Sequence, residues 1–152
     1  MKIILGLLCV AFVYGSDMNV TKPVSIETNI SIEPQTKHSF EQLLQDAKQK
    51  DKIIIIKATA PHCHYCLKMD QEVLHDQEVI SVLQKDFLLF DVDVSRETIP
   101  LDLQVSMTPT FFFVFPPNHE GKVKTKRIPG AWTKEDFLQI LKESLIAKKK
   151  QQ

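Results

Sequence analysis

The sequence lacks several features that would point to a particular partner or environment. Its 19 basic and 19 acidic residues leave no net charge, so there is no electrostatic basis for binding a polyanion such as nucleic acid. It also has no apolar run near the roughly 20 residues that a membrane-spanning helix needs. Glycine is scarce, with only 4 residues, and no internal repeat or low-complexity tract divides the chain. We therefore expect 152 residues of ordinary composition to form one globular core.

Cysteine is scarce as well, and the first of the 3 cysteines lies in a segment of distinct composition. Lys2 precedes the apolar run Ile3–Val13, and a small residue follows before the chain turns polar. This pattern predicts a secretory signal peptide over residues 1–15, because the run is too short for a membrane anchor. Cleavage would remove Cys9. Residues 16–37, rich in β-branched side chains with two prolines, are predicted to form an extended N-terminal arm or an extra edge strand.

The other two cysteines form the motif Cys63-His64-Tyr65-Cys66, directly after the apolar run Ile53–Ile56. The motif therefore lies where a strand passes into a helix. The positive end of the helix dipole and a charged His64 both favour a thiolate, so Cys63 is the predicted nucleophile. Exported proteins that use disulfides as structural links usually carry several separated pairs. A lone close pair is more typical of a redox site, and it would constrain the unfolded chain little.

Hydrophobic spacing and capping residues predict the order α-β-α-β-α-β-β-α. The expected class is α/β, with a central mixed β-sheet flanked by helices on both faces. In such sheets, sites lie beyond the carboxyl ends of the parallel strands, which is where the Cys63 motif falls. The predicted elements are a helix at 39–50, a strand at 53–59, a helix from 63 that breaks near 75–76 and resumes after Asp76, a strand at 87–94, a short helix at 96–104, strands at 110–115 and 123–128, and a final helix that opens at Thr133.

Several features of the sequence occur together: the pair Cys63 and Cys66 after the first core strand, Met69 three residues further on, the sequence Met107-Thr108-Pro109 before the strand at 110–115, and the turn at Gly130 before the last helix. On these features the chain resembles the thioredoxin superfamily over residues 38–147, which would leave 148–152 as a basic C-terminal tail. The resemblance implies a thioredoxin fold and thiol–disulfide exchange. Exported thioredoxin-like proteins, with periplasmic oxidoreductases of the DsbC kind as relatives, match best.

The resemblance also implies roles for residues around the thiol pair. Pro109 should follow a cis peptide bond beside the cysteines and leave the backbone of Thr108 free to pair with an extended substrate. His62 replaces the aromatic residue that usually precedes the first cysteine, so it joins the predicted substrate-binding residues. Tyr65 before the second cysteine is similar to the isomerase and reductase branch, which favours reduction or isomerisation over oxidation.

Lys57 departs from the family pattern, because many members carry a buried Asp or Glu six residues before the first cysteine. Two interpretations are open. A desolvated Lys57 could stabilise the thiolate or, with a lowered pKa, accept its proton. Alternatively, its side chain could simply reach solvent. With His64 and Tyr65, Lys57 makes up the predicted set of thiolate-tuning residues.

These patterns together predict an exported, periplasmic thiol:disulfide oxidoreductase that reduces or isomerises disulfides of other exported proteins. We expect a monomer that needs no cofactor or metal and is recycled by a membrane thiol donor of the DsbD kind. A dithiol oxidase of the DsbA kind is one alternative. Another is a metallochaperone that binds Cu(I) or Zn²⁺ through His62, Cys63, His64 and Cys66, although ligands packed so closely in sequence rarely surround one ion.

Overall fold

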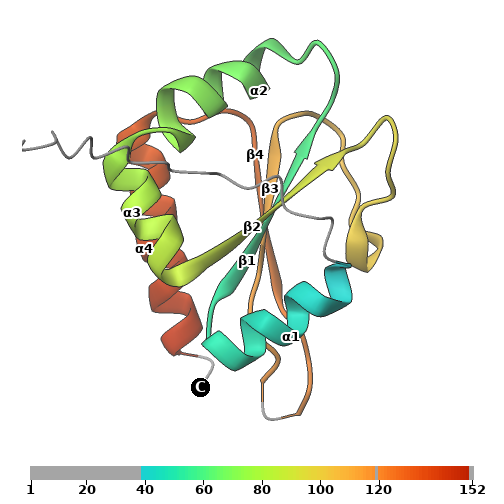
Figure 1. Ribbon diagram of the computed structural model, residues 1–152, viewed down its shortest axis with the longest axis vertical. Helices are drawn as coiled ribbons and strands as arrows, with labels where there is room; N and C mark the ends of the chain where they lie inside the picture. Colours follow the sequence, from blue (N-terminus) through green and yellow to red (C-terminus); the bar gives the residue numbers. More distant parts are fainter. Residues whose placement is uncertain (1–38, 119, 151–152) are drawn as a thin grey trace, which may run out of the picture. The chain divides into compact units, whose positions relative to one another are not determined.

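The computed structural model describes residues 39–118 and 120–150 (Figure 1). The predicted signal peptide, residues 1–15, and the predicted arm, residues 16–37, lie outside this range. The strands are β1 (Ile53–Thr59), β2 (Phe87–Asp93), β3 (Thr110–Val114) and β4 (Thr125–Pro129). The helices are α1 (Phe40–Lys50), α2 (His64–Met69), a π-helical segment (Asp70–Leu74), α3 (Gln77–Asp86), a short 3-10 turn (Pro100–Asp102) and α4 (Lys134–Lys149). Of the helices in the described ranges, none has the length and apolar character to cross a membrane.

The four strands form one mixed sheet in the order β2-β1-β3-β4. β1 runs parallel to β2 and antiparallel to β3, and β3 pairs with β4 as an antiparallel hairpin. The two central strands are almost entirely buried, as their continuous apolar sequences predict for strands covered on both faces. The predicted class, an α/β fold with a mixed sheet flanked by helices, is confirmed.

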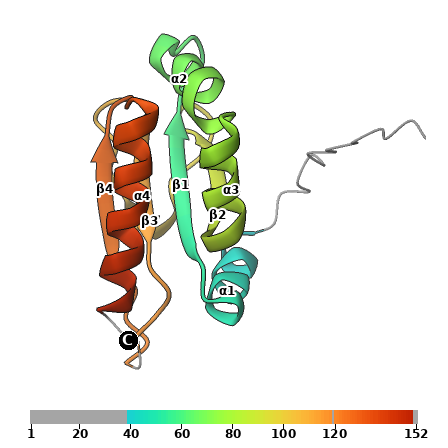
Figure 2. The ribbon, with the colours of Figure 1, turned by 90° about the vertical axis from the view of Figure 1, so that its left-hand side faces the viewer.

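Alternate side chains of β1 and β3 enter two separate cores. Ile53 and Ile55 face α3 and α4, where they pack with Phe137 and other apolar residues of those helices. Ile54 and Ile56 face the opposite side and pack against α1. Figure 1 shows α1 on one side of the sheet and α3 and α4 on the other, and in Figure 2 the latter two lie side by side in front of the sheet. The period of two along β1 thus fixes which helix covers which face.

The topology brings separate segments of sequence to one end of the sheet. β1 ends there and leads into α2, which crosses the upper end of the sheet in Figure 1. β3 is antiparallel to β1 and therefore begins at this end, with Thr110 opposite Ala58. β4 also ends here, because Pro129 pairs with Thr110 and the Gly130 amide donates to the carbonyl of Pro109 at 2.8 Å.

Helix boundaries follow their predicted caps. The Ser39 hydroxyl accepts from the Gln42 amide while the Gln42 side chain bonds back to the Ser39 amide, a complete capping box at α1. The Asp76 carboxylate accepts from the amides of Glu78 and Val79 and opens α3 after the predicted break. Thr133 caps α4, which continues to Lys149, so the helix passes the predicted boundary between the domain and its tail at 147.

The predicted short helix at 96–104 is wrong. This segment contains only the 3-10 turn at Pro100–Asp102. Leu101 and Asp102 have positive φ values of 61° and 53°, a left-handed conformation that an α-helix of L-residues does not continue. The segment does contribute Ile99 to the core on the α1 side of the sheet. The hairpin strand β4 also begins at Thr125, two residues later than predicted.

Candidate active site

The cysteines of the motif form a disulfide at the start of α2. Cys63 is the N-cap of this helix, and its Sγ accepts a hydrogen bond from the Cys66 amide at 3.2 Å. Backbone amides at a helix start are otherwise without partners, so they are ready to stabilise negative charge on a sulfur at this place. The strand-to-helix junction that the sequence predicted is therefore where the structure places the pair.

The two sulfurs differ in access to solvent. Cys66, on α2, is 6% exposed, whereas Cys63 is partly exposed. A disulfide or thiol of another protein can therefore reach Cys63 but not Cys66. This asymmetry agrees with the prediction that Cys63 is the nucleophile.

The peptide bond between Thr108 and Pro109 is cis, and it lies at the same end of the sheet as the disulfide. Thr110 directly after it is fully buried, and its hydroxyl donates to the Met107 carbonyl at 2.7 Å. Behind this turn, Arg127 of β4 donates to the Ser106 hydroxyl, also at 2.7 Å. The turn that carries Thr108 is therefore held from both sides.

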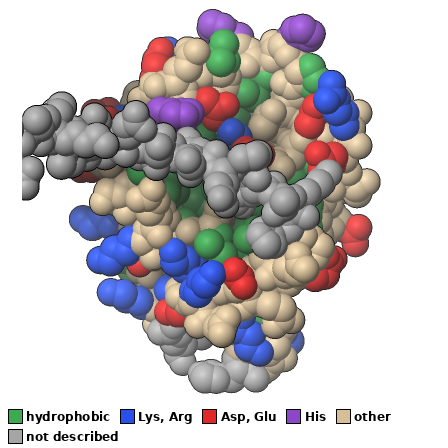
Figure 3. Space-filling view, in the orientation of Figure 1, with side chains coloured by type: hydrophobic (Ala, Val, Ile, Leu, Met, Phe, Trp, Pro, Cys, Tyr) green, Lys and Arg blue, Asp and Glu red, His purple; other side chains and the backbone are tan. Residues whose placement is uncertain are grey.

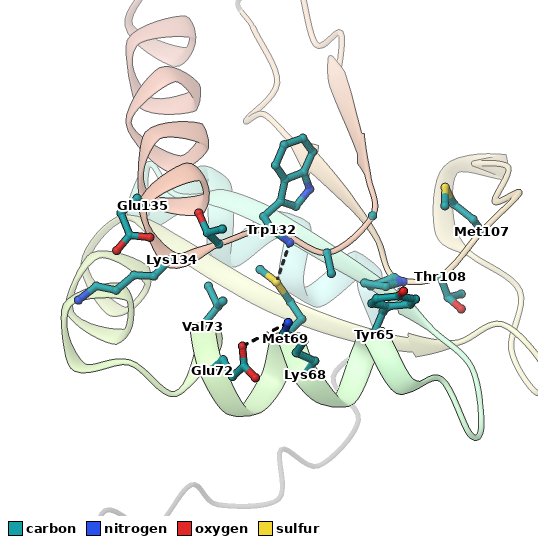
Figure 4. A pocket seen from close by; sticks show the side chains of 14 residues that line it. Tyr65, Lys68, Met69, Glu72, Val73, Met107, Thr108, Trp132, Lys134 and Glu135 are labelled. Carbon is teal, nitrogen blue, oxygen red and sulfur yellow. Dashed lines mark hydrogen bonds and ion pairs between the residues drawn. The ribbon is translucent and has the colours of Figure 1, made fainter.

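A groove of about 580 Å³ runs along the helix that carries the cysteines. In Figure 4 one wall comes from this helix, with Tyr65, Lys68 and Glu72, and the opposite wall from the loop that carries Trp132. Thr108 and Pro109 close one end, and Lys134 lies toward the other. Neither cysteine lines the groove, but Tyr65, which directly precedes Cys66, does. The groove is open enough to hold an extended chain, with apolar and charged groups along both walls.

Exposed apolar side chains gather at this groove. Three of its lining residues are large hydrophobic groups with much of their surface in solvent: Tyr65 at 61%, Met107 at 53% and Trp132 at 37%. Leu67, on the same helix as Tyr65, is 56% exposed. Such a concentration of apolar surface around one site is characteristic of a surface that binds another protein.

Met69 links the two walls of the groove. Its side chain is 1% exposed, and its sulfur accepts the amide N–H of Trp132 at 3.5 Å (Figure 4). Unbranched, polarisable methionine suits an irregular gap of this kind between a helix and a loop. The methionine three residues after Cys66 therefore fixes the distance between the helix and the Trp132 loop.

Lys57 lies on β1 below the helix that carries the cysteines, and it is 8% exposed. Its ammonium group contacts two carboxylates, Asp70 Oδ1 at 2.6 Å and Asp91 Oδ1 at 2.8 Å. Asp91 is its direct partner on the parallel strand β2. Asp70 belongs to the helical segment that follows α2. One buried cation therefore joins the two parallel strands to the helix of the active site.

The ion pairs of Lys57 bear on both of its predicted interpretations. Burial, the largest single influence, acts to lower its pKa, but the charge of Asp91 and the hydrogen bonds and charge of both carboxylates outweigh it, and the net pKa is raised. The prediction that Lys57 could accept a proton through a lowered pKa is therefore wrong. The second interpretation, a side chain that simply reaches solvent, does not hold either, because the ammonium group contacts two carboxylates and the residue is only 8% exposed.

The histidines of the motif lie outside the groove. His62 and His64 are both exposed and neither lines the groove, while His62 adopts a left-handed backbone with φ of 59°. The ring of His64 instead contacts Tyr65 edge-on, with centroids 5.5 Å apart. In Figure 3 histidine side chains stand at the upper end of the molecule, where α2 lies. No cluster of three or more metal-ligating side chains occurs within residues 39–118 and 120–150.

Sequence reasoning missed three residues of this site. Asp70 could have been found, since it is four residues after Cys66 and so on the same face of a helix. Asp91 could be found only with the register of β1 against β2, which the sequence does not determine. Trp132 has no motif of its own, although it lies two residues after Gly130, in the loop that contacts Met69 of the active-site helix.

Comparisons with known proteins agree with this arrangement. A family model described as a thioredoxin-like domain matches residues 40–145. Among solved structures, a thioredoxin from Thermus thermophilus is 25% identical with a TM-score of 0.62, covering 72% of this chain and 85% of that one. The reduced DsbD C-terminal domain of Neisseria meningitidis is 16% identical with a TM-score of 0.53, covering 69% and 93%. A DsbH oxidoreductase is 21% identical, also with a TM-score of 0.53, covering 71% and 82%.

No curated protein matches the sequence. Since the family model spans most of the chain, this protein belongs to the thioredoxin-like domain family. The predicted fold is thereby confirmed, and the Cys63–Cys66 disulfide lies within the matched region.

Proposed function

We propose that this protein is an exported thiol:disulfide oxidoreductase that reduces or isomerises disulfides of other periplasmic proteins. The observation that carries the proposal is the disulfide between a partly exposed Cys63 and a buried Cys66 on α2, a helix whose Tyr65 lines an open groove. Export rests on the apolar pattern of residues 1–15. The expected partners are proteins with disulfides, and a membrane thiol donor of the DsbD kind returns the pair to the dithiol form.

The reaction proceeds by two exchanges at sulfur. The Cys63 thiolate attacks a substrate disulfide, so that a Cys63–substrate bond forms and one substrate sulfur leaves as a thiol. Cys66 then attacks Cys63 and releases the second substrate sulfur, which reduces the substrate and oxidises the pair to the disulfide. Isomerisation follows when the substrate's own thiol attacks the mixed disulfide first. The groove supports this, because an extended segment bound between Tyr65 and Trp132 would lie along the helix that carries the cysteines.

Trapping of the mixed disulfide tests the proposal. A Cys66→Ser variant expressed in full length should accumulate covalent adducts with exported proteins, because the intermediate cannot be resolved. The matched Cys63→Ser variant keeps a thiol, but a buried one, and should form none. Adducts with neither variant, or equally with both, contradict the proposal. The reduction potential of the Cys63–Cys66 pair then distinguishes a reductant from an oxidase. A value nearer about −270 mV indicates a reductant, and one nearer about −120 mV indicates an oxidase.

A further inference from the structure

The resolving step needs a proton acceptor, and the buried lysine below the site cannot supply it. Cys66 must lose its proton before it can attack Cys63, since the thiolate is the nucleophile. It is 6% exposed, so bulk water has poor access to it. Lys57 is held as an ammonium group by two carboxylates and has no free lone pair for a proton. A carboxylate of the same cluster is the remaining candidate.

Asp70 is placed for this role by helix geometry. Its backbone N–H donates to the Cys66 carbonyl, so the two residues are one helical turn apart on the same face. Side chains of helices tilt toward the N-terminus, which carries the Asp70 side chain back toward Cys66. Asp91, by contrast, lies on β2 and is 57% exposed.

A change in helix type begins at the same residue. The segment from Asp70 to Leu74 is π-helical, and the His75 amide closes it by donating to the Asp70 carbonyl at 3.2 Å. Short π-helical insertions redirect side chains and occur frequently at functional sites. A ring nitrogen of His75, Nδ1, also lies 2.5 Å from the Asp70 carbonyl oxygen. The backbone around Asp70 is therefore fixed by a special local conformation as well as by the ion pair.

We propose that the Asp70 carboxylate accepts the proton of the Cys66 thiol during resolution, and that Lys57 is the positioning residue that holds this carboxylate under the active-site helix. The inference rests on the proposed function and adds a proton route to it. As the proton moves to Asp70, the Cys66–Cys63 bond forms, the Cys63–substrate bond breaks, and the substrate leaves as a thiolate. The Asp70 side chain is 33% exposed, so it can return the proton to solvent between turnovers.

The two exchanges can be timed separately with 5,5′-dithiobis(2-nitrobenzoate). Attack by Cys63 releases a first coloured thiolate, and resolution by Cys66 releases a second. The full-length chain is used with Cys9→Ser in every sample, so that only the pair reacts. Asp70→Asn should leave the first phase intact and slow the second by about 100-fold, the low end of the range for general base catalysis. Asp93→Asn makes the same change at a β2 carboxylate that binds Ser95 instead of Lys57, and should match the wild type in both phases.

The pH profile distinguishes proton transfer from a purely structural effect. Below the usual thiol pKa of about 8.5, the second phase of Asp70→Asn should rise about tenfold per pH unit, because only the spontaneously ionised thiol reacts. The wild-type rate should change much less. Lys57→Met keeps the acceptor but removes the group that positions it. The second phase should therefore be slower, while its pH dependence stays as shallow as that of the wild type. Asp70→Glu should restore most of the wild-type rate.

Several results would overturn this assignment. They are a second phase of Asp70→Asn with the wild-type rate, an equal slowing of both phases, or a pH dependence as shallow as that of the wild type. Urea unfolding of each variant confirms that it is folded before the rates are compared. If the proposed function itself fails, Cys66→Ser forms no adducts with exported proteins, whatever the phases with the small reagent. The two failures are thus separable.

Discussion

Replacement of Lys57 by methionine tests whether the ion pairs beneath the site stabilise the fold. Methionine has a similar length and no charge, so the variant removes the cation without leaving a large cavity. What remains is two carboxylates, Asp70 and Asp91, that have lost their common partner. The free energy of unfolding should fall because these charges are then uncompensated next to a buried, apolar side chain.

The size of this loss in unfolding free energy depends on how exposed each charged partner is. Removing one member of a fully buried ion pair costs about 3–5 kcal/mol, while exposed pairs contribute about 0–1 kcal/mol. Lys57 resembles the first case, with a side chain 10% exposed, but Asp70 at 33% and Asp91 at 57% retain much of their hydration. We therefore expect Lys57→Met to lower the free energy of unfolding by about 2 kcal/mol, between these limits.

Equilibrium urea unfolding at several pH values measures this loss. The pKa of Lys57 is raised in the folded state. Its contribution to the free energy of unfolding is therefore fully present below about pH 10.4, the usual pKa of lysine, and is lost only as the pH rises through the higher folded pKa. The difference between wild type and variant should therefore stay constant between about pH 7 and pH 10. Lys48→Met, an exposed lysine on α1, is the matched control and should change the stability by less than about 0.5 kcal/mol.

A double-mutant cycle completes the test. If Lys57 and Asp70 interact as the distance of 2.6 Å indicates, then Lys57→Met with Asp70→Asn should cost less than the sum of the single changes, with a coupling of about 1 kcal/mol or more. A loss equal to that of the Lys48 control, or strict additivity in the cycle, would refute the argument that the buried cation is stabilised by these carboxylates.

Two further predictions concern the groove and the start of α3. Trp132→Ala should raise KM for reduction of a disulfide-bonded protein such as insulin by about tenfold, because a large aromatic group on the groove wall is lost. Ile146→Ala, which trims another exposed apolar residue far from the groove lining, is its control, and equal KM values for the two variants would contradict a binding role. Asp76 has a lowered pKa, chiefly through its hydrogen bond with Lys134, so its stabilisation is present above about pH 3.9 and is lost as the pH falls through the folded value. The Asp76→Asn variant retains a capping side chain but has no carboxylate to protonate. Its midpoint temperature of thermal unfolding should therefore fall less between about pH 5 and pH 2 than that of the wild type. Parallel curves of midpoint temperature against pH would contradict the prediction.

The fold could be predicted from the sequence because its signals are local. The continuous apolar runs of β1 and β3 predict buried central strands, and Ser39, Asp76 and Thr133 predict helix starts through hydrogen bonds that span only three residues. The segment 96–104 was mispredicted because its outcome depends on two residues with positive φ. Neither is glycine, so composition gave no warning of the left-handed backbone.

The site residues with a local sequence pattern could likewise be predicted, whereas those that depend on distant partners could not. Cys63, Cys66 and the Thr108-Pro109 turn carry a sequence pattern, so they could be predicted, and the sheet brings them to one end. Lys57 could be singled out as unusual, but its role could not be read, because that depends on which side chains surround it. Whether a buried lysine is neutral or charged is decided by partners as distant in sequence as Asp91, and these become visible only when the strands are in register.

The net charge of the cluster formed by Lys57, Asp70 and Asp91 also bears on whether the protein acts as a reductant or an oxidant. A site that strongly stabilises a thiolate stabilises the reduced form and so makes its disulfide a strong oxidant, as in DsbA. A buried Lys57 alone would act in that sense. Here it is bound by two carboxylates, so the cluster below the cysteines carries a net negative charge, which disfavours a nearby thiolate. The buried lysine is thus no argument for an oxidase. The charge balance around it instead agrees with the reducing or isomerising role that we propose.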